Sequence, residues 1–201
     1  MSEHFAAVAA GPLVHDTVAR AWQVLDAVTD PEIPVVSLRE LGVLRDIRQD
    51  DNGILVVITP TYSGCPAMHQ MEEDIQAALV REGIAARVVT QLAPVWTTDW
   101  ITEAAKQKLL DYGIAPPHAR LPGQSRASPD HTEDGPRAGS AVPITLKPRW
   151  QSLLERDAAP VVCPHCGSEN TTETSHFGST ACKALYRCLD CREPFDYFKP
   201  F

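Results

Sequence analysis

The chain has 201 residues, 44% of them hydrophobic, which is enough for one ordinary domain and a second, smaller one. No apolar run approaches the roughly 18–20 residues of a membrane span, and the N-terminus lacks the basic region of a secretory signal, so a cytoplasmic protein with no membrane partner is expected. The net charge of −8 comes from residues 1–114, which hold 8 Lys and Arg against 16 Asp and Glu. Because binding to a phosphate backbone needs a basic stripe, a nucleic-acid partner is disfavoured.

The first 60 residues predict a helix followed by a hairpin. Apolar residues at helical spacing predict a helix over 13–28, and the prolines at 31 and 34 prevent it from continuing. Residues 43–48 and 54–59 read as strands on either side of Asp51-Asn52-Gly53. Asn-Gly accepts the positive φ angles of a tight turn, so these strands are expected to pair.

The next 50 residues predict helix, strand and helix. The first helix starts at Pro66 and stops before Gly83, residues 85–92 form a strand, and Thr98 or Asp99 caps a last helix that runs to Tyr112. The fold class expected for residues 1–114 is therefore α/β (α+β), with three helices and about three strands.

The remainder of the chain predicts a linker and a small metal-stabilised domain. Residues 115–160 contain eight prolines and little periodicity, which is typical of a flexible linker, with a short helix expected around residues 150–156. Residues 161–201 are expected to form an all-β zinc ribbon with four cysteine ligands. A domain of this size buries too little apolar surface to fold without a metal ion.

The metal ligands are expected to be two C-x-x-C pairs, Cys163 with Cys166 and Cys188 with Cys191, separated by 21 residues. Each pair presents two sulfurs to one ion, and two pairs complete a tetrahedral thiolate cage. Zinc is the first choice, because four thiolates leave no open coordination position. A rubredoxin-like iron ion fits the same cage. Disulfides or free thiols are the alternative, less expected in a reducing compartment.

Two features of this last segment leave alternatives open. Cys182 is either a small buried residue beside the metal site, on the same strand face as Cys188, or a substitute ligand during metal exchange. The aromatic residues near the end either fill the small core of the ribbon or form a docking peptide at residues 198–201. These aromatic residues are Phe195, Tyr197, Phe198 and Phe201.

Cys65 is the only cysteine among the first 162 residues. Because Pro66 favours the first helical position, Cys65 is expected at a helix N-cap, where the backbone N–H groups would lower its pKa and make it reactive. The alternative is a buried, inert cysteine. The sequence contains no G-x-G-x-x-G, P-loop, H-E-x-x-H or G-x-S-x-G motif and hence no self-contained catalytic constellation.

Three motifs resemble the MIP18 (DUF59) family: DPEIPVVS at residues 30–37, Leu41-Gly42, and TPTYSGCP at residues 59–66. Members of that family act in iron–sulfur cluster assembly and delivery. The resemblance implies that Cys65 handles iron or an iron–sulfur cluster transiently. It also implies that Glu32 and Thr61, in the same motifs, shape the pocket around it.

Three further motifs resemble one branch of that family, found among the components of bacterial phenylacetyl-CoA epoxidase (phenylacetate-CoA oxygenase) systems. They are PVWTTDWIT at residues 94–102, CKALYRC at residues 182–188 and EPFDYFKPF at residues 193–201. The resemblance implies a non-catalytic accessory or maturation factor for the di-iron and iron–sulfur centres of that oxygenase, with its oxygenase or reductase subunits as partners. A stoichiometric structural or rubredoxin-like electron-transfer subunit is the alternative, and a homodimer stays open.

Overall fold

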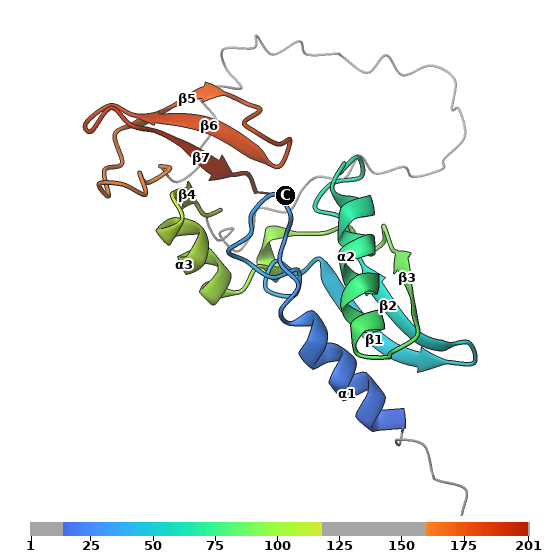
Figure 1. The fold of residues 1–201 in the computed structure, drawn as a ribbon. Coiled ribbons are helices and arrows are strands. Elements are labelled where there is room, and N and C mark those ends of the chain that lie inside the picture. Colours follow the sequence, from blue (N-terminus) through green and yellow to red (C-terminus); the bar gives the residue numbers. More distant parts are fainter. Residues whose placement is uncertain (1–13, 118–159, 201) are drawn as a thin grey trace, which may run out of the picture.

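The computed structural model describes residues 14–117 and 160–200, which form an α/β part and a β-ribbon part (Figure 1). In these two ranges no helix combines the length and the apolar character needed to cross a lipid bilayer. The elements in chain order are α1 (Val14–Leu25), β1 (Leu44–Asp50), β2 (Gly53–Ile58), α2 (Met68–Arg81), β3 (Ala86–Thr90), the 3-10 helix η1 (Thr98–Trp100), α3 (Glu103–Asp111), β4 (Ile114–Ala115), β5 (Thr171–Ser175), β6 (Lys183–Cys188) and β7 (Pro194–Phe198).

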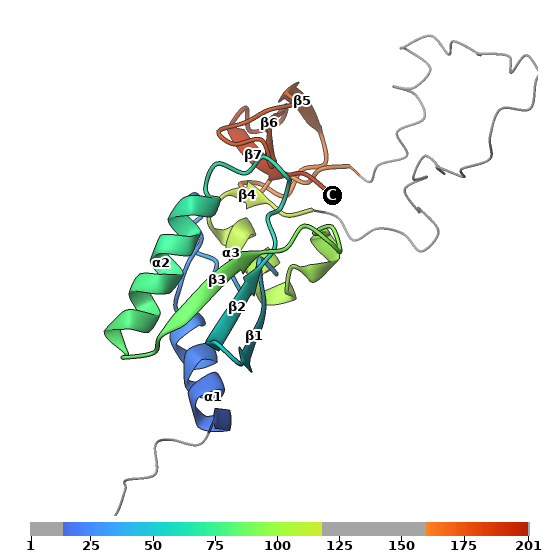
Figure 2. The same ribbon diagram turned by 90° about the vertical axis from the view of Figure 1, so that its right-hand side faces the viewer.

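The α/β part is built on a three-stranded sheet in the order β1-β2-β3. Strands β1 and β2 form the predicted antiparallel hairpin, with Asp50 opposite Gly53 and a φ of 109° at this glycine. Strand β3 runs parallel to β2, because α2 carries the chain back across the sheet between them. Figure 2 shows α1 and α2 on the same side of this sheet.

The core of the α/β part lies between these two helices and the sheet. Apolar side chains at helical spacing, such as Leu25 of α1 and Ile75 and Leu79 of α2, are almost completely buried against the strands. Helix α2 ends where predicted, since Gly83 follows it with a φ of 70°. The predicted order of helices and strands is confirmed for this part.

The start of the third helix differs from the prediction. Thr98 belongs to η1, and α3 begins only after Thr102, whose hydroxyl accepts a hydrogen bond of 3.1 Å from the Ala105 N–H. Extended backbone at Ile101 separates the two helical segments and places its side chain in the core. Two threonines four residues apart both suit a cap, and the burial of the residue between them decides which one caps α3.

The ribbon part contributes three strands to a four-stranded sheet in the order β4-β7-β6-β5, and β4 comes from the α/β part. Strands β5, β6 and β7 are antiparallel neighbours, as expected for an all-β ribbon. A second, smaller core lies beneath them. Its buried members are Ala115, Val161, Cys163, Ala184, Cys188, Phe195 and Tyr197. The expected fold class, an α+β domain followed by a four-cysteine ribbon, is confirmed.

The two parts are in direct contact. Strand β4 pairs in parallel with β7, and Phe198 and Cys182 of the ribbon are buried in the core of the α/β part. The Phe198 ring lies 6.0 Å from that of Trp96, and both residues are 1% exposed. The boundaries at 114/115 and 160/161 stay a prediction, although Ala115 already belongs to β4. The helix expected around residues 150–156 lies outside the described residues.

Candidate functional site

The four predicted ligand cysteines lie together at one end of the ribbon. Their Sγ atoms are all within 4.8 Å of one another, with 3.8 Å between those of Cys163 and Cys191 and 3.6 Å between those of Cys166 and Cys188. A tetrahedral ion with metal–sulfur bonds of about 2.3 Å separates its sulfur ligands by about 3.8 Å. The four side chains therefore fit one tetrahedral metal ion without rearrangement.

Backbone geometry positions these sulfurs. In the first knuckle, the Gly167 N–H donates to the Cys163 carbonyl at 2.9 Å with a φ of 74° at the glycine. In the second knuckle, the Cys191 N–H donates to the Cys188 sulfur at 3.5 Å. This bond, together with the Asp190 N–H, lowers the pKa of Cys188 to about 6. The structure thus favours the thiolate form that a metal requires.

Cys65 lies in the loop between β2 and α2 and is half-buried. The expectation that it caps a helix is wrong, because α2 begins at Met68 with Ala67 as its cap. The expectation of a lowered pKa is wrong as well. Burial raises the pKa of Cys65 against the opposing effect of the Ala67 N–H, and the nearby Glu32 and Cys182 raise it further. The thiol is therefore protonated at neutral pH when no cation is present.

Of the two residues predicted to shape the pocket of Cys65, Glu32 lies near it and acts on its pKa. The loop that carries Glu32 is fixed by the buried Asp30, whose carboxylate accepts hydrogen bonds from the N–H groups of Glu32 and Ile33, both at 2.8 Å. Thr61 is buried in the loop that carries Cys65. The assignment of these residues to iron handling stays a prediction.

Cys182 is buried, as the first interpretation expects, but it does not lie beside the four-sulfur site. It precedes β6, while Cys188 ends that strand, and it packs into the α/β core together with Cys65. Six residues of strand span about 20 Å, so the two cysteines cannot bind the same ion. Strand alternation alone missed this separation, whereas the length of the strand would have revealed it.

The tail aromatic residues divide between the two cores. Phe195 and Tyr197 fill the ribbon core, and Phe198 fills the α/β core. Because Phe198 and Lys199 are buried within the chain itself, they are not available to a docking peptide. Phe201 lies outside the described residues. The interpretation of the tail as core is confirmed for the three described aromatic residues.

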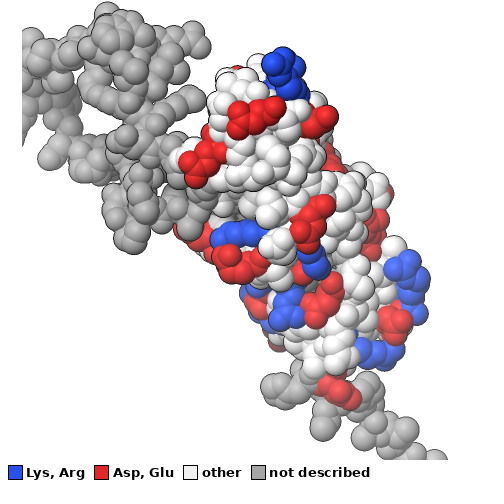
Figure 3. All heavy atoms as spheres, turned by 90° about the vertical axis from the view of Figure 1, so that its left-hand side faces the viewer, with Lys and Arg blue, Asp and Glu red and all other residues white. Residues whose placement is uncertain are grey.

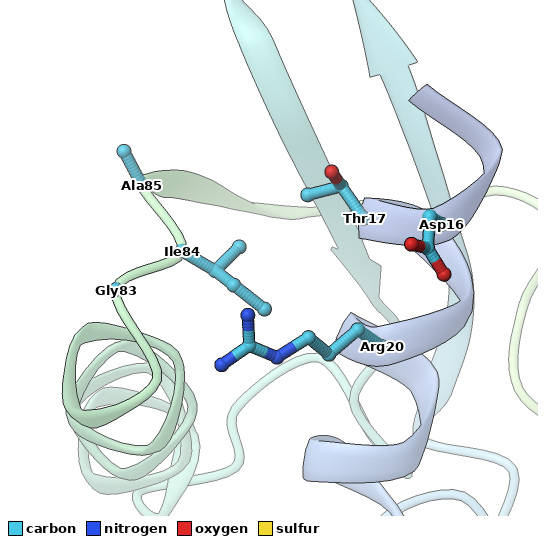
Figure 4. A pocket seen from close by; sticks show the side chains of 6 residues that line it. All are labelled: Asp16, Thr17, Arg20, Gly83, Ile84 and Ala85. Carbon is cyan, nitrogen blue, oxygen red and sulfur yellow. The ribbon is translucent and has the colours of Figure 1, made fainter. Parts of the chain in front are cut away.

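Other surface features offer no comparable site. A hollow of about 240 Å³ lies between α1 and the loop after α2, and Figure 4 shows the Arg20 side chain reaching across it. Arg20 is engaged there by an ion pair with Glu82 at 2.9 Å. On the face drawn in Figure 3, acidic and basic side chains are interspersed without a basic patch.

Comparison with known proteins agrees with this geometry. A curated relative from Escherichia coli (strain K12), described as the putative D component of 1,2-phenylacetyl-CoA epoxidase, is 41% identical over 199 residues, which are 96% of each chain. The chain belongs to the PaaD family. Residues 148–199 match the family profile described as "PaaD zinc beta ribbon domain". Residues 19–90 match the one described as "Iron-sulfur cluster assembly protein". The resemblance stated from the motifs is confirmed.

Two solved structures resemble part of this PaaD family member. A DUF59 domain from Bacillus anthracis is 26% identical, covers 47% of this chain and 92% of its own, and has a TM-score of 0.44. A conserved hypothetical protein from Thermotoga maritima is 27% identical, covers 44% of this chain and 89% of its own, and has a TM-score of 0.38.

Proposed function

We propose that this chain is a non-catalytic accessory factor that helps to load the di-iron and iron–sulfur centres of a phenylacetyl-CoA ring-epoxidising oxygenase. The name of the Escherichia coli relative and the match to an iron–sulfur assembly family support a place in that system. Under this proposal the partners are the oxygenase and reductase subunits, and the protein works in the cytoplasm.

The observation that carries the proposal is the contrast between the two kinds of cysteine. The four ribbon sulfurs close a cage around one ion and leave no open position for chemistry, which suits a structural zinc ion. Cys65 stands outside this cage, half-buried beside Glu32. A catalytic thiol needs a lowered pKa, whereas the pKa of Cys65 is raised. Such a thiol can still bind a metal ion by losing its proton on coordination.

The proposal is tested by producing the oxygenase subunits with the wild-type chain, with Cys65→Ser, and without the chain. We expect oxygenase that is poor in iron and inactive in the last two cases. Ser63→Ala, an exposed residue in the same loop, is the matched control and should give iron-loaded oxygenase. Adding pure protein without an iron source should not restore activity. Fully iron-loaded oxygenase from cells that lack the chain would overturn the proposal.

A stoichiometric electron-transfer subunit is the second candidate, favoured by one feature of the cage. Cys166 is exposed, so an iron ion bound there would have a sulfur ligand at the surface, where an electron could leave or enter. Metal analysis and the absorption spectrum of the purified protein separate the two candidates. Iron with thiolate charge-transfer bands, and an equal amount of the chain in the active oxygenase, would establish this second function. One zinc ion per chain supports the first.

A further inference from the structure

Two cysteines that do not belong to the four-sulfur cage meet where the α/β part and the ribbon touch. Cys65 lies in the loop before α2, and Cys182 lies in the turn before β6. Both pack into the same hydrophobic core, Cys182 as a buried member at 5% exposure and Cys65 at its partly exposed edge. Cys65 can therefore be reached from solvent, with Cys182 behind it.

Cys182 is held in place from two sides. Its Sγ atom lies 2.9 Å from the Thr180 hydroxyl, and its carbonyl accepts a hydrogen bond from the Lys199 N–H at 3.0 Å. The neighbouring Phe198 anchors the same segment in the α/β core. A thiol fixed in this way is positioned for binding before any ligand arrives.

The charges around the two thiols are unbalanced toward the negative. Lys183, 4% exposed, is the buried cation of this cluster, and its ammonium group lies 3.5 Å from the Asp196 carboxylate. It also acts on Asp30 and Glu32, both of which lie close enough to the two cysteines to influence them. One ammonium group thus faces three carboxyl groups and two ionisable thiols. A cation is the ligand that would restore the balance.

We propose that Cys65 and Cys182 together bind one thiophilic divalent cation, with Glu32 as the carboxylate ligand at the solvent side. On binding, both thiols release their protons to solvent, and the two thiolates neutralise the two positive charges of the ion. Among the described residues, only the ribbon cysteines already form a group of three or more ligands within 4.8 Å. The loop of residues 30–33 therefore moves inward to bring Glu32 to the ion. That this ion is iron in transit rests on the proposed function, whereas the binding itself does not.

The proposal is tested with Co²⁺ as the probe, added to full-length protein whose ribbon cage is filled with one equivalent of zinc. We expect one equivalent of Co²⁺ to bind with sulfur-to-cobalt charge-transfer absorption. Cys65→Ser and Cys182→Ser should each lose this absorption and keep the zinc. Thr180→Ala is the control that keeps both thiols and the Co²⁺ band. Because Cys182→Ser could perturb the fold, wild-type protein is also alkylated with and without Co²⁺, and Co²⁺ should protect both cysteines together.

Unchanged Co²⁺ absorption in a folded Cys182→Ser variant, or protection of Cys65 alone, would overturn the proposal. Failure here is distinguishable from failure of the proposed function. If Cys182→Ser still supports iron loading of the oxygenase while Cys65→Ser does not, the two-thiol site falls and the maturation function stands. If the oxygenase loads iron without this chain, the function falls, and the Co²⁺ titration still decides the site.

Discussion

Phe198→Ala tests whether the ribbon completes the core of the α/β part. Phe198 is 1% exposed and lies 6.0 Å from the ring of Trp96, which is equally buried. A buried aromatic side chain removes at least about 150 Å² from water, and at about 25 cal/mol per Å² this area is worth close to 4 kcal/mol. Alanine retains a small share, so we expect the free energy of unfolding to fall by about 3 kcal/mol, in line with measured Phe→Ala changes in cores.

The measurement is urea unfolding of the metal-loaded protein, followed by hydrogen exchange of the peptide that contains Trp96. Loss of Phe198 should increase exchange in this peptide, although it lies about 100 residues away in sequence. Phe177→Ala is the matched control, because Phe177 is 63% exposed and contacts the Lys199 ammonium group at 4.5 Å. That contact is worth about 0.5–1 kcal/mol. Equal losses for the two variants, or unchanged exchange around Trp96, would refute the shared core.

Three further predictions concern a glycine, the cage and the lone thiol. Gly42→Ala should destabilise the fold by at least about 2 kcal/mol in urea unfolding, because φ is 71° and the new Cβ would lie 2.6 Å from the Trp100 Cβ. Gly83→Ala, with a φ of 70° and open space, should cost only about 1 kcal/mol, and similar costs would argue against the clash. Cys188→Ser should reduce bound metal from one ion to none and remove exchange protection from residues 160–200 and from β4; retained metal would contradict the four-sulfur cage. Alkylation of Cys65 in cation-free protein should be slower at pH 7 than that of a free thiol and should accelerate as the pH rises, because burial raises its pKa; faster reaction at pH 7 would restore the activated thiolate.

The elements that the sequence predicts well are those set by local chemistry. Asn52-Gly53 allows only a tight turn, and Gly83 supplies the positive φ that ends α2. The four cage ligands follow from their spacing for the same reason, since each C-x-x-C pair is a local turn. Where two local signals compete, as at Thr98 and Thr102, burial of Ile101 decides, and that burial is not local.

The composite core and the thiol pair could not be predicted, because they depend on contacts between distant residues. Cys65 and Cys182 are 117 positions apart, and nothing in either local sequence refers to the other. The predicted activation of Cys65 failed for a related reason. A helix terminus is visible in sequence, whereas the burial that raises the pKa of Cys65 comes partly from the packing of the core around it.

The pairing of β4 with β7 also sets an order of events while the ribosome makes the chain. Domains usually fold as they emerge, from the N-terminal side onward. A nascent chain that ends before residue 182 has neither the partner strand of β4, nor the ring that covers Trp96, nor the second thiol. Its α/β part leaves the ribosome with an unfinished core. Iron that meets the chain at this stage finds Cys65 alone, so loading has to wait until translation has supplied the ribbon.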